Sequence, residues 1–91
     1  MSATVRIPTI LREYTAGVSE VKVPGSSLAE VLDSLEADHP GIKARVLDEE
    51  GALRRFVNVY VGEEDVRFSG GLATKISDGA KVSIIPAVAG G

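Results

Sequence analysis

Only one stretch of this chain carries a sustained helical pattern, and this limits the number of layers that the fold can have. Its apolar positions recur at the spacing of one helix face: Leu28, Val31, Leu32 and Leu35. Ser27 and Glu30 stand three residues apart, which is the pattern of a capping box. The sequence therefore predicts one main helix that begins after Ser27 and ends before Pro40.

The other periodic segments alternate with a period of two, which is typical of strands. These are residues 4–9, 19–23, 56–61, 66–68 and 81–85. Residues 10–17 show no period and are predicted as a loop, whereas 42–47 are predicted to form a short second helical turn over the core. We therefore expect an α+β domain over residues 1–86, with a mixed sheet of about five strands packed on one main helix.

A single helix can cover only one face of such a sheet. By alternation, four residues with large apolar surfaces fall on the other face: Pro8, Phe56, Tyr60 and Ile85. Exposed apolar patches often mark interaction sites, so these residues predict a partner-binding face.

The last residues of the chain predict a reactive tail. Pro86 follows the final strand and lacks an N–H, so it is expected to end the strand pairing. Residues 87–91 then contain only small side chains, and the last four are Val88, Ala89, Gly90 and Gly91. A Gly-Gly end has no Cβ atoms and can enter a narrow channel, so we expect a flexible tail that presents the Gly91 carboxylate. Ordinary fraying of a chain end is the alternative.

The composition excludes several classes of function. The hydrophobic share of 44% and the charged share of 25% are those of a globular domain, and the net charge of −3 argues against nucleic-acid binding. No apolar run approaches the roughly 20 residues that cross a membrane, so a cytoplasmic protein is expected. The chain has no cysteine and one histidine, His39, which lies at the predicted helix end. We therefore expect no catalytic residue, no metal site and no enzymatic activity of its own.

Three runs of sequence carry a resemblance to a known family. Residues 78–91 resemble the closing segment of the ThiS/MoaD family of bacterial sulfur carriers, which have the ubiquitin-like β-grasp fold. Residues 7–12 and 67–74 are similar to the CysO branch of that family, the carriers of cysteine biosynthesis in actinobacteria. One departure is Ala87, which stands where the family often has a second proline.

The resemblance implies a mechanism at Gly91. An E1-like adenylyltransferase/sulfurtransferase would use ATP to adenylate the carboxylate, and sulfur transfer would leave a C-terminal thiocarboxylate. A pyridoxal-phosphate cysteine synthase would consume that sulfur, and a JAB-type zinc protease would release the product. ATP, pyridoxal phosphate and zinc would thus belong to the partner enzymes, with no cofactor in this chain.

Two alternatives stay open. The small subunit of molybdopterin synthase and the thiamine sulfur carrier share the same terminus and serve a different acceptor. A ubiquitin-like protein modifier would instead be joined to lysines of other proteins.

Overall fold

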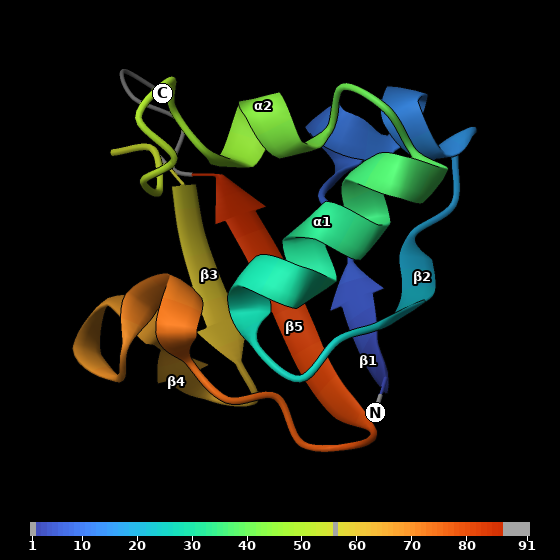
Figure 1. Ribbon diagram of the computed structural model, residues 1–91. Coiled ribbons are helices and arrows are strands. Elements are labelled where there is room, and N and C mark those ends of the chain that lie inside the picture. The colour runs from blue at the N-terminus through green and yellow to red at the C-terminus, as the bar shows by residue number, and fades with distance from the viewer. Residues whose placement is uncertain (1, 56, 87–91) are drawn as a thin grey trace.

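The computed structural model describes residues 2–55 and 57–86, so Phe56 and the predicted tail lie outside the described residues. Its strands are β1 (Ser2–Arg6), β2 (Glu20–Pro24), β3 (Val57–Val61), β4 (Glu64–Asp65) and β5 (Ala80–Pro86). The α-helices are α1 (Leu28–Asp38) and α2 (Lys43–Val46), and short 3-10 helices form η1 (Thr9–Thr15), η2 (Val66–Phe68) and η3 (Gly71–Ala73). These elements form two layers, with α1 lying across one face of the sheet (Figure 1).

The final strand occupies the centre of the sheet, whose order is β2-β1-β5-β3-β4. β5 runs parallel to β1, with Ala3 aligned with Ala80, and antiparallel to β3. β1 and β2 form an antiparallel pair at one edge. This confirms the mixed five-strand sheet that the sequence predicts, and it places the strand that precedes the tail between two neighbours (Figure 1).

The helix α1 begins at the predicted cap, with one difference. Ser27 Oγ accepts a hydrogen bond from the Glu30 backbone N–H at 3.3 Å. The Glu30 carboxylate, however, accepts from the backbone N–H and the hydroxyl of Ser26, both at 2.9 Å, and not from Ser27. Ser27 is itself bridged to Lys75, which fixes the backbone ahead of the helix and leaves the Ser26 N–H facing Glu30.

The core lies between α1 and the sheet. All four apolar positions of the helical stripe are completely buried, as are Val5, Val59 and Val82 from the three central strands. The predicted second helical turn is confirmed as α2, and Ile42 and Val46 are also completely buried there. Burial of each such side chain contributes roughly 1.5–3 kcal/mol before chain entropy is subtracted. The interior is thus closed by helices on one side of the sheet alone.

Two predicted elements are wrong in kind. Most of the expected loop at residues 10–17 is the 3-10 helix η1, in which Leu11 is buried. Residues 66–68 form η2 and not a strand, because the Asp65 side chain accepts the Arg67 backbone N–H at 2.9 Å and caps a local turn. The edge strand β4 lies two residues earlier.

Pro86 was expected to follow the final strand, but in the structure it belongs to the sheet. It is the last residue of β5 and is aligned with Val57 of β3. A proline is tolerated at this position because the strand ends here, so its missing N–H removes no hydrogen bond from the middle of the sheet.

Candidate functional site

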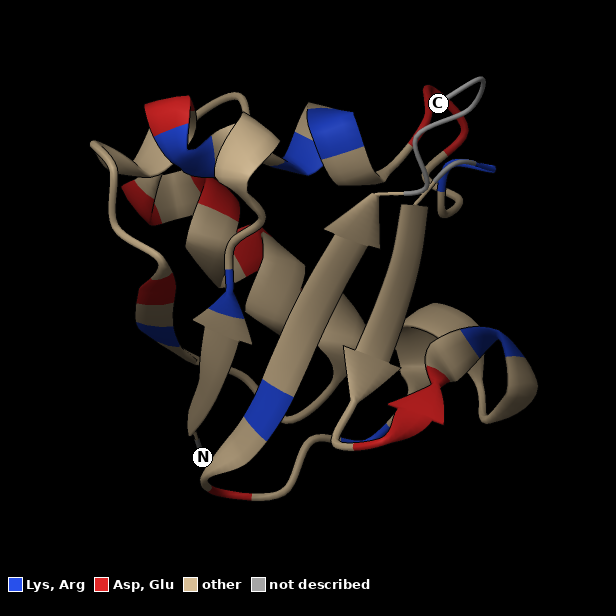
Figure 2. Ribbon diagram, turned by 180° about the vertical axis from the view of Figure 1, so that it is seen from behind, with Lys and Arg blue, Asp and Glu red and all other residues tan. Residues whose placement is uncertain are grey.

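The face of the sheet opposite α1 is open, and it carries two of the predicted partner-binding residues. Tyr60 of β3 is half-buried, and Ile85 of β5 is 48% exposed. Tyr60 is aligned with Ser83 and Ile85 with Asn58, so the two apolar side chains are diagonal neighbours. No helix covers this face in the view from behind (Figure 2).

The remaining residues make the open face more polar than expected. Its other described positions on the central strands are Thr4, Arg6, Asn58, Lys81 and Ser83. Pro8 lies beyond the end of β1 and lines a groove of about 380 Å³ together with Ile85. The apolar part is therefore confined to the end of β5 near Pro86, and its role in partner binding stays a prediction.

The end of β5 is held differently from its middle. Pairing with β1 stops at Arg6 and Ser83, whereas pairing with β3 continues to Pro86. Beyond Arg6, the Ile7 backbone N–H bonds to the Ser19 carbonyl on the β2 side at 2.8 Å. The last three residues of β5 are thus paired on one side only.

A second groove, of about 570 Å³, opens on the other side of Pro86, and we call it the tail-root groove. Its apolar lining residues are Ile10, Leu11, Val57 and Pro86, and its charged lining residues are Glu13, Arg45, Asp48, Arg54 and Arg55. It is built by η1, α2, the segment after α2 and the adjoining ends of β3 and β5. Nothing in the periodicity singled out these residues, because they come from separate segments of mostly irregular structure.

Arg45 is fixed at the side of this groove by Tyr14. The Arg45 Nε donates to the Tyr14 hydroxyl at 2.8 Å, and the guanidinium carbon lies 5.9 Å from the ring centroid. That hydrogen bond raises the pKa of Arg45 further above its ordinary value. Gly41 lies against the same ring at φ +100°, where an added Cβ would approach Tyr14 to 3.0 Å. A glycine is therefore required for α2 to sit against η1.

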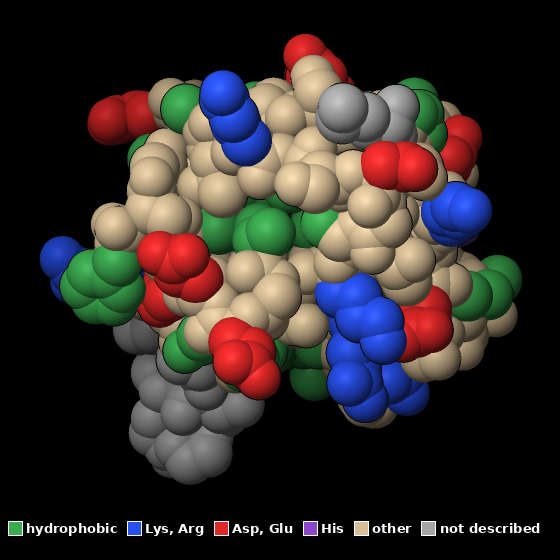
Figure 3. Space-filling view, turned by 90° about the horizontal axis from the view of Figure 1, so that it is seen from below, with side chains coloured by type: hydrophobic (Ala, Val, Ile, Leu, Met, Phe, Trp, Pro, Cys, Tyr) green, Lys and Arg blue, Asp and Glu red, His purple; other side chains and the backbone are tan. Residues whose placement is uncertain are grey.

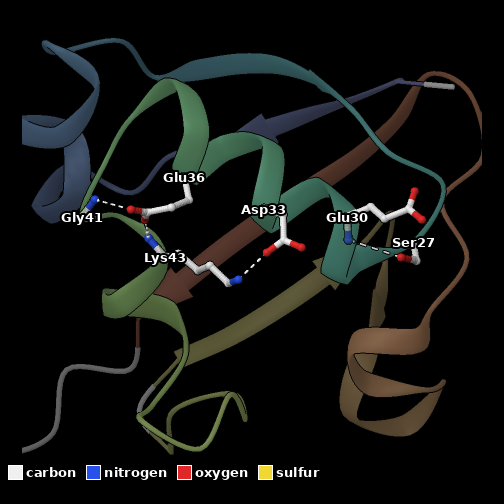
Figure 4. A network of polar contacts seen from close by, with 6 residues as sticks. All are labelled: Ser27, Glu30, Asp33, Glu36, Gly41 and Lys43. Carbon is white, nitrogen blue, oxygen red and sulfur yellow. Dashed lines mark hydrogen bonds and ion pairs between the residues drawn. The ribbon is translucent and has the colours of Figure 1, made fainter.

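Glu36 ties α1 to the start of α2 (Figure 4). One carboxylate oxygen accepts the Gly41 backbone N–H and the other accepts the Lys43 backbone N–H, both at 2.9 Å. These two bonds lower the pKa of Glu36 below its ordinary value of 4.5. Lys43 also forms an ion pair with Asp33 of α1. This cluster positions α2 and is structural.

The described residues give no support for a metal site, for a catalytic role of His39 or for a membrane-spanning helix. No group of three or more His, Cys, Asp or Glu side chains among residues 2–55 and 57–86 is placed to hold a metal ion. His39 follows α1, where its backbone N–H bonds to the Leu35 carbonyl at 2.8 Å. In the described parts of the chain no helix has the length and apolar character needed to cross a membrane.

The end of the molecule far from Pro86 has a groove of about 370 Å³ lined by residues 26 and 75–78. Figure 3 shows this end, where acidic and basic side chains are interspersed around a small apolar area. The surface around the end of β5, where the chain continues toward Gly91, is thus the candidate site.

Comparison with known proteins supports this choice. The ThiS family model matches residues 5–91, which includes the whole of the tail. The sulfur carrier protein CysO of Mycobacterium tuberculosis is 56% identical over 93 residues, and the match covers 100% of both chains. Its crystal structure superposes with a TM-score of 0.91, covering 94% of this chain and 99% of that one.

Two further proteins bear on partners and alternatives. CysO in the crystal structure of the Amycolatopsis orientalis BexX/CysO complex is 54% identical, with a TM-score of 0.92 and coverage of 98% of this chain and 99% of that chain. The small archaeal modifier protein 3 of Haloferax volcanii is 39% identical over 66 residues, which is 72% of this chain and 71% of that protein. The fold is therefore that of ubiquitin-like carriers, as the sequence predicted.

Proposed function

Because this chain belongs to the ThiS family, as a small sulfur carrier that acts with partner enzymes and is not itself an enzyme, we propose that its Gly91 carboxylate carries the sulfur. The observation that supports this most strongly is the extent of the family match. It reaches Gly91, and in the sequence the tail directly follows β5, the central strand of the sheet. The last atoms of residues 87–91 then react in a partner's active site.

The chemistry of the terminus proceeds in two steps. A carboxylate is a poor electrophile, so the E1-like adenylyltransferase joins a Gly91 oxygen to the α-phosphorus of ATP and releases pyrophosphate. A sulfide ion can then attack the acyl carbon, displace AMP and leave the thiocarboxylate directly. If a persulfide of the enzyme attacks instead, AMP leaves and an acyl disulfide forms, and a second thiol of the enzyme then breaks its S–S bond by disulfide exchange and releases the same group. The product is a thiocarboxylate, and without a cysteine in the chain its C-terminus is the position that can hold sulfur covalently.

We assign the sulfur to cysteine biosynthesis, in the cytoplasm. The thiocarboxylate attacks an activated serine held by a pyridoxal-phosphate cysteine synthase, and a JAB-type zinc protease then releases cysteine from the carrier. The identity of 56% to the mycobacterial CysO supports this assignment over the molybdopterin and thiamine branches. The BexX/CysO complex supports partner binding by a carrier of this type.

A ubiquitin-like modifier is the second candidate. It is favoured by the 39% identity to a small archaeal modifier protein, although that match covers only 72% of this chain. A modifier would form isopeptide bonds to lysines of other proteins, and a sulfur carrier would not.

The test is a mass measurement on the intact protein. After incubation with its E1-like enzyme, ATP and a sulfur donor, the protein should gain the mass of one oxygen-for-sulfur exchange, and fragmentation should place the change on Gly91. Extension of the chain by one residue beyond Gly91 is the matched control and should abolish the reaction, because reacting atoms must be closely aligned. Absence of sulfur at Gly91 with every activating enzyme of the family would refute the proposal.

The acceptor is tested with the same thiocarboxylate. A pyridoxal-phosphate cysteine synthase and an activated serine should convert it to a cysteinyl adduct. A thiocarboxylate that supplies only a molybdopterin precursor would leave the carrier function standing and refute the cysteine assignment.

A further inference from the structure

The length of the tail restricts where an activating enzyme can bind, and the following argument rests on the proposed function. Five residues follow Pro86, and at about 3.3–3.6 Å per residue they span roughly 17 Å when fully extended. An enzyme that adenylates Gly91 must therefore contact or closely approach the surface around Pro86. The tail-root groove is part of that surface, because Pro86 itself lines it.

The tail-root groove has the form of a docking site for an apolar side chain. Leu11 and Val57 are each 6% exposed and lie in its wall, whereas Ile10 is 61% exposed beside them. A large aliphatic side chain exposed next to a concave apolar surface gains free energy when a partner covers it.

The arginines of the groove are positioned but keep hydrogen-bonding capacity. Arg45 bonds through Nε to Tyr14, and Arg54 bonds through Nε to the Ala44 carbonyl at 2.9 Å. Neither makes a hydrogen bond through its Nη atoms to another residue in the described ranges, and Arg55 makes none there with its side chain. A guanidinium whose two Nη groups are available can bind a carboxylate with two hydrogen bonds.

Arg67 differs from these arginines because it donates hydrogen bonds through both of its Nη atoms. Its Nη1 donates to the Asn58 side chain at 2.6 Å, and its Nη2 donates to the carbonyls of Arg54 and Val57. Arg67 therefore holds η2 against β3, whereas Arg45 and Arg54 are each held through a single nitrogen.

The two acidic residues of the groove, Glu13 and Asp48, offset only part of the charge of its three arginines. The Asp48 carboxylate accepts the backbone N–H groups of Glu50 and Ala52 at 2.9 and 3.0 Å, so it is engaged within its own turn. Three of the ten basic residues of a chain with net charge −3 meet at this one groove. Its charge thus differs in sign from that of the protein as a whole.

We propose that the tail-root groove docks a segment of the activating enzyme that presents an apolar side chain flanked by carboxylates. The apolar side chain packs against Ile10, Leu11 and Val57. The carboxylates bind the guanidinium groups of Arg54 and Arg55. Docking there would hold the body of the carrier while the tail enters the enzyme's active site.

The test is the ATP–pyrophosphate exchange that the E1-like enzyme catalyses in the presence of this carrier. The double substitution Arg54→Glu and Arg55→Glu should raise the KM for the carrier by about tenfold or more with little change in kcat. Increasing salt should raise the KM of the unsubstituted carrier and have a weaker effect on the variant. Arg45 is left unchanged because it also supports Tyr14.

One control variant tests the effect of net charge, a second groove variant tests the apolar contact, and separate measurements test folding. Lys22→Glu with Lys75→Glu makes the same charge change at two exposed positions away from the groove and should leave KM within about twofold. The milder variant Ile10→Ser removes only apolar surface at an exposed side chain and should raise KM by about threefold. Circular dichroism and thermal unfolding establish that each variant is folded.

The outcomes are distinct. An unchanged KM in folded groove variants, with sulfur still loaded on Gly91, would overturn the groove and leave the proposed function intact. A lowered KM would show that the groove holds the carrier's own tail, and concentration-dependent dimerisation lost in the variants would show a second copy as its occupant. A carrier that no family enzyme activates would overturn both proposals.

Discussion

The two faces of the sheet use the same strands and differ in what covers them. On the covered face, Val59 and Val82 are completely buried under α1. On the open face, the neighbouring residues Tyr60 and Ser83 are half-buried and lie opposite one another. The covered face determines whether the domain folds, because its apolar side chains are buried in the folded protein and exposed to water in the unfolded chain. We expect substitutions on the open face to change the free energy of unfolding much less. This face is therefore available to bind a partner.

The largest expected effect comes from placing a charge on the covered face. Val59→Asp should lower the free energy of unfolding by about 4 kcal/mol or more, because a buried carboxylate has no partner there. Small domains of this kind have about 5–15 kcal/mol in total, so the variant should be largely unfolded or strongly destabilised in a urea titration. Ser83→Asp introduces the same group on the open face and should change the value by about 0.5 kcal/mol or less. Equal losses in the two variants would break the distinction between the faces.

The next effect concerns recognition by the open face. Tyr60→Ala and Ile85→Asp should each weaken binding to the adenylating enzyme by about tenfold, because exposed apolar anchors contribute most to an interface. Their free energies of unfolding should change by only about 1 kcal/mol. Isothermal calorimetry against the enzyme measures the affinity. Wild-type affinity in both folded variants would exclude this face as the partner-binding surface.

A smaller effect tests the polar contact by which Glu36 joins α1 to α2 on the covered side. The pKa of Glu36 is lowered in the folded protein by the backbone N–H groups of Gly41 and Lys43, so ionised Glu36 stabilises the fold. This contribution is complete above the unfolded-state pKa near 4.5 and is lost as the pH falls through the lowered folded-state pKa. Glu36→Gln should therefore be less stable than the wild type at pH 7, and the difference should shrink as the pH falls below 4.5.

The matched control for this measurement is Glu49→Gln, at an exposed position in the turn after α2. It should follow the wild-type pH dependence of the melting temperature. A pH-independent gap between Glu36→Gln and the wild type would show that the carboxylate acts by packing and not by its charge.

The smallest expected effect on stability comes from the tail. Deletion of Gly90 and Gly91 should shift the melting temperature by no more than about 2 °C, since the proposed arm takes no part in either face. The same deletion should abolish adenylation. A large drop in melting temperature would mean that the tail belongs to the packed structure.

The regular parts of the fold were predictable because periodicity reports burial directly. The stripe from Leu28 to Leu35 and the alternation of β3 each identify one buried face without any knowledge of the neighbours. The family resemblance supplied the β-grasp fold and the role expected of Gly91. Residues 66–68 were misread, since their alternation is outweighed by a side-chain cap from Asp65.

The tail-root groove could not be predicted in the same way. Its arginines come from α2 and from the segment before β3, and they meet only after Glu36 and Tyr14 have fixed α2 in place. No single segment has a sequence pattern that predicts such a surface. The polar character of the open face was also missed, because the prediction considered four apolar residues and left out the polar ones between them, such as Ser83 and Asn58, which are aligned with Tyr60 and Ile85.

The parallel pairing of β1 with β5 has a consequence for how the protein is made. Ala3 and Ala80 lie side by side at the middle of the sheet, so nearly the whole chain must be synthesised before its central contact can form. Closing so long a loop slows folding relative to local pairing. A nascent chain that ends before β5 lacks the middle of its sheet and has no finished face to display. A partner that recognises the folded body would therefore bind only molecules in which β5 has already been synthesised.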